Sequence, residues 1–438
     1  MKKILVVSCT PWNANNSVGN TYANLFDGMD DCVIAHIYCA DGADNDPKVS
    51  RAYQITEKQL VLNRLGRLPV AGGEVAVQQI ADTGETLTGW ERSFMSFAKK
   101  QRWMILFGAR EAIWKLGRWN NDGLAQFIRE FGPDLVFVNL YDNVYMNRVD
   151  LAVQRLAGVP MVGYIWDDYY TLHQFSLSPF YWANRLYFRR LVRRVIDRCS
   201  RLYVISDLQK QEYDRIFQKD CHLLTKGGVF EGEHPAPKAP GRRLQLLYTG
   251  NIGAGRWRSL ALLSRVIRRI NASCPAGQGL ELTIYTATPA TRAMKQQLNC
   301  PGAVRLAGRI PYREVAQKQA EADLLVHVEP TGLAHRWESR LSFSTKLIDY
   351  MQSYRPILAY GLLEQASLAH LKAKDAAFVA TNEAELERTL REILARPALL
   401  EEYAAKGWAC GAACHDIRRI HALLRQDFEE VCNAGCTD

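Results

Sequence analysis

The sequence has no run of apolar residues near the length of about 20 that a membrane-spanning helix needs. Its apolar beginning, residues 4–7, is too short for a signal peptide and leads directly into a polar segment with a proline, which predicts a first β-strand. The sequence also contains no Walker loop, no Gly-x-Ser-x-Gly elbow and no His-Glu-x-x-His motif. It therefore predicts a soluble or peripheral protein that lacks the motifs of these three enzyme classes.

Neither disulfide pairing nor a strong charge points to a class of protein. The eleven cysteines are odd in number and scattered over 438 residues, a length that builds a core without disulfides, so a reducing cytoplasm is expected. The net charge of +9 is mild for a nucleic-acid-binding protein, and we expect no nucleic-acid partner. The same charge suits an anionic membrane surface or a substrate that carries phosphate.

Short apolar runs bounded by turn residues recur in two series, which predicts two parallel sheets in an α/β protein. The first series comprises residues 3–8, 32–38, 134–140, 160–166 and 202–206, and the second comprises residues 244–248, 280–285, 304–307, 323–328 and 356–359. Helical patterns lie between the runs, and Ser206 with Gln209 has the spacing of a capping box. The predicted fold is two Rossmann-like, doubly wound domains.

A polar seam with three prolines, residues 231–241, separates the two series. We expect an N-terminal domain over residues 1–232, a linker over 233–241, a second domain over 242–410, and final helices over 411–438 that can cross back to the first domain. Residues 50–125 show no clear strand and mix aromatic with basic side chains, which predicts a helical insertion at about residues 45–125.

A glycine-rich segment follows the first strand of the second series. Its three glycines, beginning at Gly250, let backbone N–H groups approach an anion, and the following helix presents its positive end. Arg256 and Arg258 can bind phosphate oxygens. A glycine turn with two solvated arginines is the alternative, but the strand before and the helix after favour a phosphate site that includes Gly250, Asn251 and Arg256.

A second candidate segment has two hydroxyl side chains and a lysine at the start of a predicted helix. Ser344, Thr345 and Lys346 suit the binding of a pyrophosphate, with Ser344 as an ordinary N-cap as the alternative. Asp349 lies one turn later and can accept hydrogen bonds from ribose hydroxyls.

Together with residues 355–358, these two segments resemble the donor half of retaining, family-4-type glycosyltransferases of the GT-B fold. In the first half, residues 17–20 with Gly19 resemble the glycine loop that faces the donor phosphates. Residues 203–206 and 225–229 resemble the last strand and the turn before the linker. The resemblance covers nearly the whole length apart from residues 40–130.

Two departures affect the sugar contacts that the resemblance implies. The family has two glutamates eight positions apart, and here Leu341 stands in the first position and Asp349 in the second. Asn251 stands where the family has an arginine. Glu329 and Glu338 are the candidate substitutes for the missing glutamate.

The resemblance implies that a sugar leaves a UDP- or GDP-linked donor and joins an acceptor hydroxyl with retained anomeric configuration, in polysaccharide or glycolipid synthesis. The leaving pyrophosphate carries the developing negative charge, so catalysis rests on positioning and electrostatic stabilisation. Arg256, Lys346 and the backbone at Gly19 and Ser344 would supply that stabilisation. Neither a metal nor another cofactor is expected.

The candidates for a base follow the predicted strand 160–166. Asp167 and Asp168 lie at its carboxyl end, with His173 farther on, and a paired carboxylate there suits substrate hydroxyls. Simple capping or exposure to water is the equally weighted alternative. The predicted catalytic residues are therefore Asp167, Asp168, Arg256 and Lys346.

Residues 179–201 contain seven arginines and one aspartate, with aromatic residues at the start. A basic helix with aromatics at one end is typical of attachment to an anionic bilayer. The alternative is a surface helix whose arginines face water. Membrane contact implies a lipid-linked acceptor and a peripheral position at the inner face of the cell membrane, and a saccharide acceptor is the other option.

Two groups of possible metal ligands remain. Residues 44–46 have the spacing of the acid pair in metal-dependent glycosyltransferases, but their polar surroundings predict a plain turn. Cys410, Cys414 and His415, and a second cysteine pair at the C-terminus, have a spacing that zinc allows. Both pairs are expected on helices without a supporting loop, so no metal site is predicted.

Two other functions stay open. An epimerase or hydrolase that acts on a nucleotide sugar has the same fold. A non-catalytic basic protein that binds nucleic acid or membrane through residues 179–201 belongs to a different class, but it has no need of the glycine-rich segment and of residues 344–346.

Overall fold

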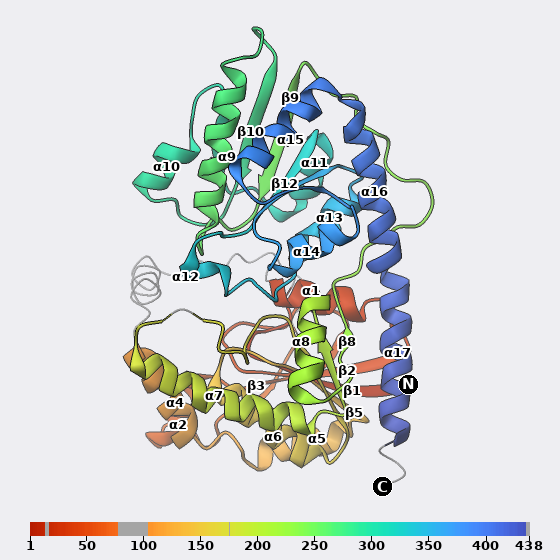
Figure 1. Ribbon diagram of the computed structural model, residues 1–438. Helices are drawn as coiled ribbons and strands as arrows, with labels where there is room; N and C mark the ends of the chain where they lie inside the picture. Colours follow the sequence, from red (N-terminus) through yellow and green to blue (C-terminus); the bar gives the residue numbers. More distant parts are fainter. Residues whose placement is uncertain (14–16, 78–103, 175, 435–438) are drawn as a thin grey trace.

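The computed structural model describes residues 1–13, 17–77, 104–174 and 176–434, which form two α/β units stacked end to end (Figure 1). The sheet of the first unit has the strand order β4-β3-β2-β1-β5-β6-β7-β8. Its strands are β1 (Lys2–Ser8), β2 (Cys32–Tyr38), β3 (Val49–Gln54), β4 (Gly73–Val75), β5 (Leu135–Asn139), β6 (Met161–Ile165), β7 (Arg201–Val204) and β8 (His222–Leu223). Neighbouring strands pair in parallel, except that β3 and β4 are antiparallel.

The sheet of the second unit has the strand order β11-β10-β9-β12-β13-β14, and every pair is parallel. Its strands are β9 (Arg243–Thr249), β10 (Gly279–Tyr285), β11 (Val304–Gly308), β12 (Leu324–Val328), β13 (Ile357–Tyr360) and β14 (Phe378–Ala380). Both sheets thus share a doubly wound order. The first strand of each lies in the interior, and beside it the order in which successive strands are added to the sheet reverses. The predicted fold class is confirmed.

Helices connect the strands and cover the faces of both sheets. Those of the first unit are α1 (Ser17–Phe26), α2 (Glu57–Arg64), α4 (Met104–Leu116), α5 (Asp122–Phe131), α6 (Val144–Ala157), α7 (Pro179–Arg198) and α8 (Asp207–Phe217). Those that follow are α9 (Arg256–Asn271), α10 (Arg292–Leu298), α11 (Tyr312–Glu321), α12 (Leu333–Arg336), α13 (Lys346–Gln352), α14 (Ala366–Ala373), α15 (Glu383–Ala395), α16 (Ala398–Cys414) and α17 (Ile417–Ala434). Within the described parts of the chain, no helix is both long and apolar enough to cross a bilayer.

Of the two hydrogen bonds in the capping box predicted at Ser206, one is present. The Ser206 hydroxyl accepts a hydrogen bond from the Gln209 backbone N–H at 3.2 Å and begins α8. The Gln209 side chain, however, accepts from the N–H of Ile205 at 3.0 Å rather than from that of Ser206. Both bonds satisfy N–H groups near the junction of β7 with α8.

The prediction that residues 50–125 form a helical insertion without a strand is wrong in part. This region contains the helices α2, α4 and α5, but it also supplies β3 and β4 at the edge of the first sheet. These strands are short and half polar, with Arg51 of β3 paired to Glu74 of β4 and to Glu130, so their apolar pattern is too weak to read. Residues 78–103, including several of the predicted aromatic and basic residues, lie outside the described part.

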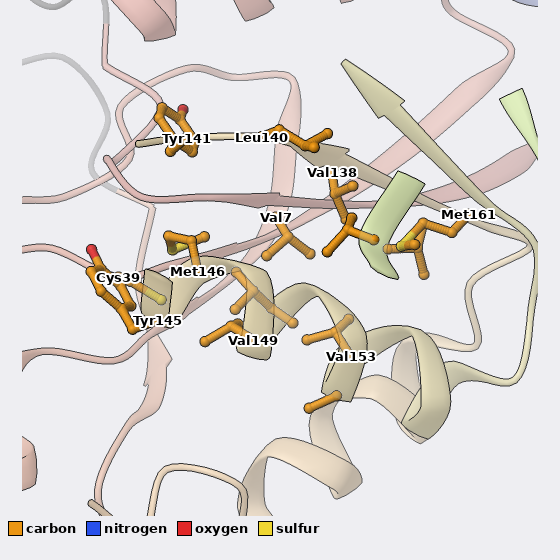
Figure 2. Close-up of a cluster of buried hydrophobic side chains, with 14 of the residues drawn as sticks. Val7, Cys39, Val138, Leu140, Tyr141, Tyr145, Met146, Val149, Val153 and Met161 are labelled. Atoms are coloured by element: carbon orange, nitrogen blue, oxygen red, sulfur yellow. The ribbon is translucent and has the colours of Figure 1, made fainter. Parts of the chain in front are cut away.

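The core of the first unit lies between the central strands and α6 (Figure 2). Val7 of β1 and Val138 of β5 are fully buried against Met146, Val149 and Val153, which recur at helical spacing on one face of α6. Each such side chain contributes about 1.5–3 kcal/mol by leaving water. Because most side chains of the central strands are apolar on both faces, polar groups gather mainly in the loops at the strand ends.

The seam between the sheets is an irregular and largely exposed segment, and it is tied to the second unit. The first sheet ends at Leu223 and the second begins at Arg243. The ring of His234 stacks on that of Tyr354 with centroids 3.7 Å apart, and Arg355 donates to the carbonyl of Ala236 at 3.1 Å.

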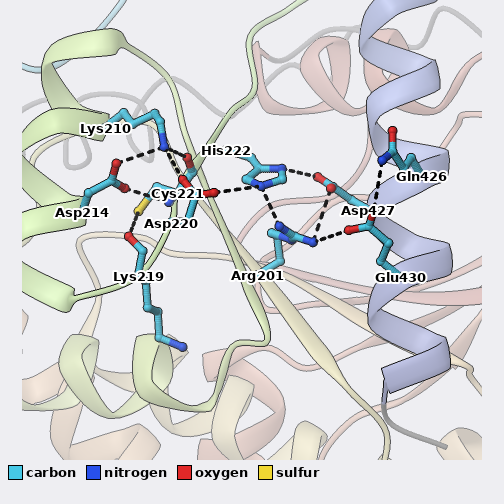
Figure 3. A network of polar contacts seen from close by, with 10 residues as sticks. All are labelled: Arg201, Lys210, Asp214, Lys219, Asp220, Cys221, His222, Gln426, Asp427 and Glu430. Carbon is cyan, nitrogen blue, oxygen red and sulfur yellow. Dashed lines mark hydrogen bonds and ion pairs between the residues drawn. The ribbon is translucent and has the colours of Figure 1, made fainter.

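The last helix, α17, runs along the first unit although the helix before it packs on the second (Figure 1). Arg201 of β7 pairs with Glu430 at 2.7 Å and also donates to His222 Nε2 at 2.6 Å, while His222 Nδ1 lies 2.8 Å from the buried Asp427 (Figure 3). Since Nε2 accepts from Arg201, the proton of His222 lies on Nδ1 and is donated to Asp427. This network fastens α17 to the β7–β8 edge.

Candidate functional site

The second sheet has its reversal of chain order at β9, which lies between β10 and β12. In doubly wound sheets, ligands bind outside the carboxyl ends of the strands at such a reversal. Gly250 follows β9 directly, and Glu329 follows β12 directly. The glycine-rich segment predicted from the sequence therefore lies at the position where this topology binds ligands.

Gly250 is required by its conformation and by the closeness of its neighbour. Its φ of +150° is disfavoured for other residues, and a Cβ atom at this position would collide with Nζ of Lys346. Asn251 shapes the rest of the loop, because its side-chain oxygen accepts from the N–H of Gly253 at 2.6 Å and from the hydroxyl of Thr288 at 2.8 Å. The loop then enters α9 at Arg256.

Lys346 carries a positive charge without an acidic partner. It is half-buried, donates to the carbonyl of Thr249 at 3.0 Å, and lies 4.9 Å from the centre of the Tyr248 ring. Within the described part of the chain, no carboxylate forms an ion pair with it. Removal from water, followed by the positive charge of Arg256, lowers the pKa of Lys346 to about 8. Such a cation is stabilised when an anion enters the site.

Arg256 is held in place by Glu329. Its guanidinium donates to Glu329 at 3.0 Å, and the other carboxylate oxygen of Glu329 lies 3.3 Å from His327 Nε2. Burial raises the pKa of Glu329, but His327 and Arg256 outweigh that effect and bring it below its usual value. Glu329 is therefore a buried, ionised anchor for Arg256. Glu338, the other candidate, lies 3.3 Å from His335 instead.

The other residues predicted in the second unit lie around Lys346 with different partners. Thr345 is the N-cap residue of α13, and no side chain caps this helix, so the alternative of Ser344 as an N-cap does not apply. The N–H of Ser344 already donates to the Ser367 hydroxyl at 3.0 Å. Asp349 forms an ion pair with Lys226 of the first unit, so its carboxylate has a partner in place of the predicted ribose hydroxyls.

The prediction of a glycine loop over residues 17–20 is wrong, because Gly19 lies in the first turn of helix α1. A Cβ atom here would collide with the backbone of Asn13. The glycine therefore permits close packing of α1 on the chain that leaves β1. Residues 14–16 lie outside the described part.

The two aspartates after β6 differ in their surroundings. Asp168 is buried and accepts from the backbone N–H of Thr171 at 2.9 Å and from the Tyr213 hydroxyl at 3.2 Å, so it stabilises its own loop, as in the capping alternative. Asp167 instead faces the other unit and accepts from the hydroxyl of Ser342. Burial raises the pKa of Asp167, and the hydrogen bonds from Ser342 and Tyr169 and the charge of Arg256 oppose this increase.

A short segment before α13 joins the two units. Arg340 donates to Glu212 at 2.6 Å and to His173 at 3.2 Å, and the carbonyl of Leu341 accepts from the Ser206 hydroxyl at 2.6 Å. Leu341 is fully buried in the hydrophobic core of the first unit. The residue that departs from the family pattern therefore holds the units together instead of facing a sugar.

Residues 44–46 form a turn only in part. Asp46 accepts from the N–H of Lys48 at 2.9 Å, as a turn residue does. Asp44, however, is fully buried and accepts from the N–H of Trp12 at 2.7 Å and lies 2.8 Å from Nδ1 of His36. The spacing of Asp44 and Asp46 gave no sign that His36 is the partner of Asp44.

Helix α7 has both a core-facing and an exposed side. Arg185 is buried and donates to the carbonyls of Asp168 and Thr171 at 3.0 and 2.9 Å, so one of the arginines is structural. Four others line a surface cavity of about 420 Å³ together with Tyr170 and Leu186: Arg189, Arg190, Arg193 and Arg194. Leu186 of this lining is 48% exposed, and Phe180, in the first turn of α7, is 73% exposed.

Sequence reasoning missed two residues of this site. Tyr248 supplies the ring beneath Lys346, and Lys226 pairs with Asp349. Tyr248 directly precedes the glycine-rich segment, which is a usable signal. Lys226 carries no such signal, because its partner lies in the other unit.

No family model matches the chain, and no curated protein matches its sequence. Solved structures do match. HepE from Anabaena in complex with UDP and glucose has a TM-score of 0.60 at 12% identity, covering 98% of this chain and 100% of that chain. Sucrose-phosphate synthase from Thermosynechococcus elongatus has a TM-score of 0.62 at 12% identity, with coverages of 99% and 100%. The UDP-forming α,α-trehalose-phosphate synthase from Burkholderia vietnamiensis has a TM-score of 0.58 at 13% identity, covering 98% of this chain and 100% of that chain.

At these identities, the likeness shows the fold alone. The two parallel-sheet units of this chain are arranged as in GT-B proteins, over nearly the full length of both chains.

Proposed function

We propose that the protein is a glycosyltransferase that moves a sugar from a nucleotide-diphosphate donor to an acceptor hydroxyl with retained anomeric configuration. The observation that carries the proposal is the half-buried Lys346, which lacks an acidic partner and lies against Gly250 at the reversal point of the second sheet. The GT-B fold, shared with proteins whose structures contain UDP or UDP-glucose, supports a nucleotide sugar as the ligand and UDP as the first nucleotide to test.

In this proposal, the donor diphosphate binds beside the Gly250 loop and contacts the ammonium of Lys346. Arg256 contacts the same phosphates. The first N–H groups of α9 already donate to carbonyls of the preceding loop, so the positive end of this helix attracts the anion through its dipole. As the sugar–oxygen bond breaks, negative charge grows on the leaving diphosphate, and these fixed donors stabilise it. Glu329 keeps Arg256 in position throughout. No metal at the diphosphate is required.

Asp167 is the proposed base for the acceptor hydroxyl. Its pKa is raised by burial, which makes the carboxylate a better proton acceptor than an exposed aspartate. Two observations support this role: Asp167 accepts a hydrogen bond from Ser342 of the second unit, and the positive charge of Arg256 lowers the pKa of Asp167 against the effect of burial. Asp168 holds the loop on which Asp167 lies.

The acceptor is proposed to be lipid-linked, with α7 attached to an anionic membrane, as in polysaccharide or glycolipid synthesis at the inner face of the cell membrane. The four-arginine cavity and the exposed Leu186 that lines it support this part of the proposal, because a basic surface beside apolar side chains is typical of interfacial helices. Tyr170, which lines the cavity, follows Asp168 closely in the chain and so links this surface to the proposed base.

A ligand panel tests the donor. UDP, GDP, ADP and their sugars are added to the full chain in thermal-shift measurements, where a ligand at 100 times its dissociation constant stabilises the protein by about 2.7 kcal/mol. One nucleotide family should shift the melting temperature. Lys346→Ala and Arg256→Ala should each abolish turnover of that donor, with Lys295→Ala, an exposed lysine of the same unit, as the control. If both variants retain turnover, the phosphate site is assigned wrongly.

Liposome sedimentation tests the membrane surface. Replacement of the four cavity arginines by glutamine should abolish pelleting with anionic vesicles and leave donor binding unchanged. The matched control replaces four exposed arginines of the second unit by glutamine: Arg268, Arg269, Arg388 and Arg391. Equal loss in both variants would mean that the attraction depends on net charge and not on α7.

A further inference from the structure

A cluster of metal-ligating side chains that has no role in the proposed function lies at the junction of the units. His370 of α14 lies beside Cys410 and Cys414 of α16, and one donor atom from each of these three residues lies within 4.8 Å of the others. His370 Nε2 is 3.6 Å from the sulfur of Cys410 and 3.3 Å from Nε2 of His415, the residue that follows Cys414. No other such group occurs among the residues that the structure describes.

The two measured separations match the edges of a tetrahedral zinc site. With Zn–S of about 2.3 Å and Zn–N of about 2.0–2.1 Å, a tetrahedron has N–S edges of about 3.6 Å and N–N edges of about 3.3 Å. A hydrogen bond would explain one of these separations, but it does not require that both occur around the same atom, His370 Nε2. His370 Nε2 is therefore placed as a corner of such a tetrahedron.

The helix geometry explains how α16 supplies two ligands. Cys410 and Cys414 are four residues apart, so their side chains lie on the same face of the helix, and that face contacts His370. Both are free thiols. This face is the support that the sequence alone did not show, because the third ligand comes from a helix 40 positions earlier.

The outer nitrogens of both histidines have hydrogen-bonding partners in the first unit. His370 Nδ1 lies 3.4 Å from a carboxylate oxygen of Asp207, and His415 Nδ1 lies 3.0 Å from the hydroxyl of Thr225. Metal-binding histidines almost always donate their other N–H to a carboxylate or a similar acceptor, which orients the ring and makes the ligating nitrogen more basic. The Nε2 of His370 is thereby directed at Cys410, and the Nε2 of His415 at His370.

We propose that His370, Cys410 and Cys414 bind one Zn²⁺ ion, and that His415, which lies outside this group of three but 3.3 Å from His370, completes the site as the fourth ligand. Two thiols lose their protons to solvent as the ion binds, and no electron transfer is involved. Four protein ligands leave no position for a substrate, so the ion is structural. It ties α14 to α16 and, through Asp207 and Thr225, ties both to the first unit.

Metal analysis of the untagged, full-length chain tests the proposal. Protein purified under reducing conditions should contain one zinc per chain by mass spectrometry of the metal. Cys410→Ser, Cys414→Ser and His370→Ala should each lose at least nine-tenths of the zinc. Cys274→Ser, which changes a half-buried free thiol elsewhere, is the control and should keep it. Equal zinc in the three ligand variants and the control would overturn the proposal.

A second measurement does not depend on the folding of variants. The wild-type protein is stripped with a chelator and titrated with Co²⁺, which should saturate at one equivalent and produce thiolate-to-metal charge-transfer absorption together with tetrahedral d–d bands. Zn²⁺ should then displace these bands. Absence of the charge-transfer absorption, or a Cys410–Cys414 disulfide in protein isolated without reductant and mapped by mass spectrometry, would overturn the proposal. Neither readout involves sugar transfer, so this proposal and the proposed function can fail separately.

Discussion

The two sheets have the same reversal of strand order, yet the polar groups at the two positions differ. Beside β1, Ser8 lies 2.8 Å from His36 Nε2, and His36 Nδ1 lies 2.8 Å from Asp44, with all three residues fully buried. Beside β9, Lys346 has no acidic partner and remains half-buried. The first position is therefore closed by groups that satisfy one another, and the second is left with a charge that requires an external partner.

The buried groups beside β1 resemble a catalytic site but are not arranged to act as one. The Ser8–His36–Asp44 chain has the hydrogen-bond order of a serine-hydrolase triad. However, Ser8 has no exposed surface and its hydroxyl donates to the carbonyl of Thr10, so the proton that a nucleophile must give to the histidine is already used in the fold. An unpartnered charge beside a glycine marks a binding site better than a familiar set of residues does.

The largest expected effect is on stability at the closed position. Asp44→Ala leaves His36 and the N–H of Trp12 without their buried partner, which should reduce the free energy of unfolding by about 3–5 kcal/mol in urea titrations. Asp46→Ala, in the same loop but with only a local turn bond, is the control and should cost about 1 kcal/mol or less. A stable Asp44→Ala protein without turnover would mean that this network is catalytic.

At the open position, the expected effect is on binding and not on stability. Lys346→Ala should weaken UDP binding by about 2–5 kcal/mol, the usual cost of removing one partner of a close charge pair, measured by calorimetry. The free energy of unfolding should stay the same or increase, because a cation held away from water is removed. If Lys346→Ala destabilised the protein as much as Asp44→Ala does, Lys346 would have a structural role, and the two positions would not differ in the way described.

The pH dependence of binding sharpens the role of the lysine. The pKa of Lys346 is about 8 in the free protein, and a bound diphosphate raises it, so binding takes up a proton above pH 8. The dissociation constant for UDP should therefore change little from pH 7 to 8, where the terminal phosphate of UDP is ionised, and increase above pH 8, by at most tenfold or about 1.4 kcal/mol per pH unit. Lys346→Arg should remove this increase, since arginine stays charged. An unchanged profile in Lys346→Arg would assign the titration to another group.

The smallest expected effect concerns the glycine beside the lysine. Gly250→Ala places a side chain at φ +150° and against Lys346, which should cost about 1 kcal/mol of stability and displace the ammonium from the diphosphate. Gly302→Ala is the matched control, because its φ is +75° and no atom lies within 4 Å of the added Cβ. Both variants should lose similar stability, and only Gly250→Ala should weaken UDP binding.

Sequence patterns were sufficient where the chemistry is local. The strand, glycines and helix around Gly250 follow one another in the chain, so the loop and the helix after it were predictable. The prediction was weaker where burial decides the role. Asp167 and Asp168 are adjacent and chemically identical, and only the packing of Tyr213 against one and Ser342 against the other separates them.

By itself, the sequence determined the alternation of strands and helices, the two-unit α/β class and the segments rich in anion-binding groups, because these depend on neighbours in the chain. The tertiary structure alone decided that Lys346 meets Gly250 without an acid, that Leu341 enters the core of the other unit, and that His370 meets Cys410. Those contacts join residues tens of positions or more apart. They arise from how sheets and helices pack against each other, and no local pattern encodes that packing.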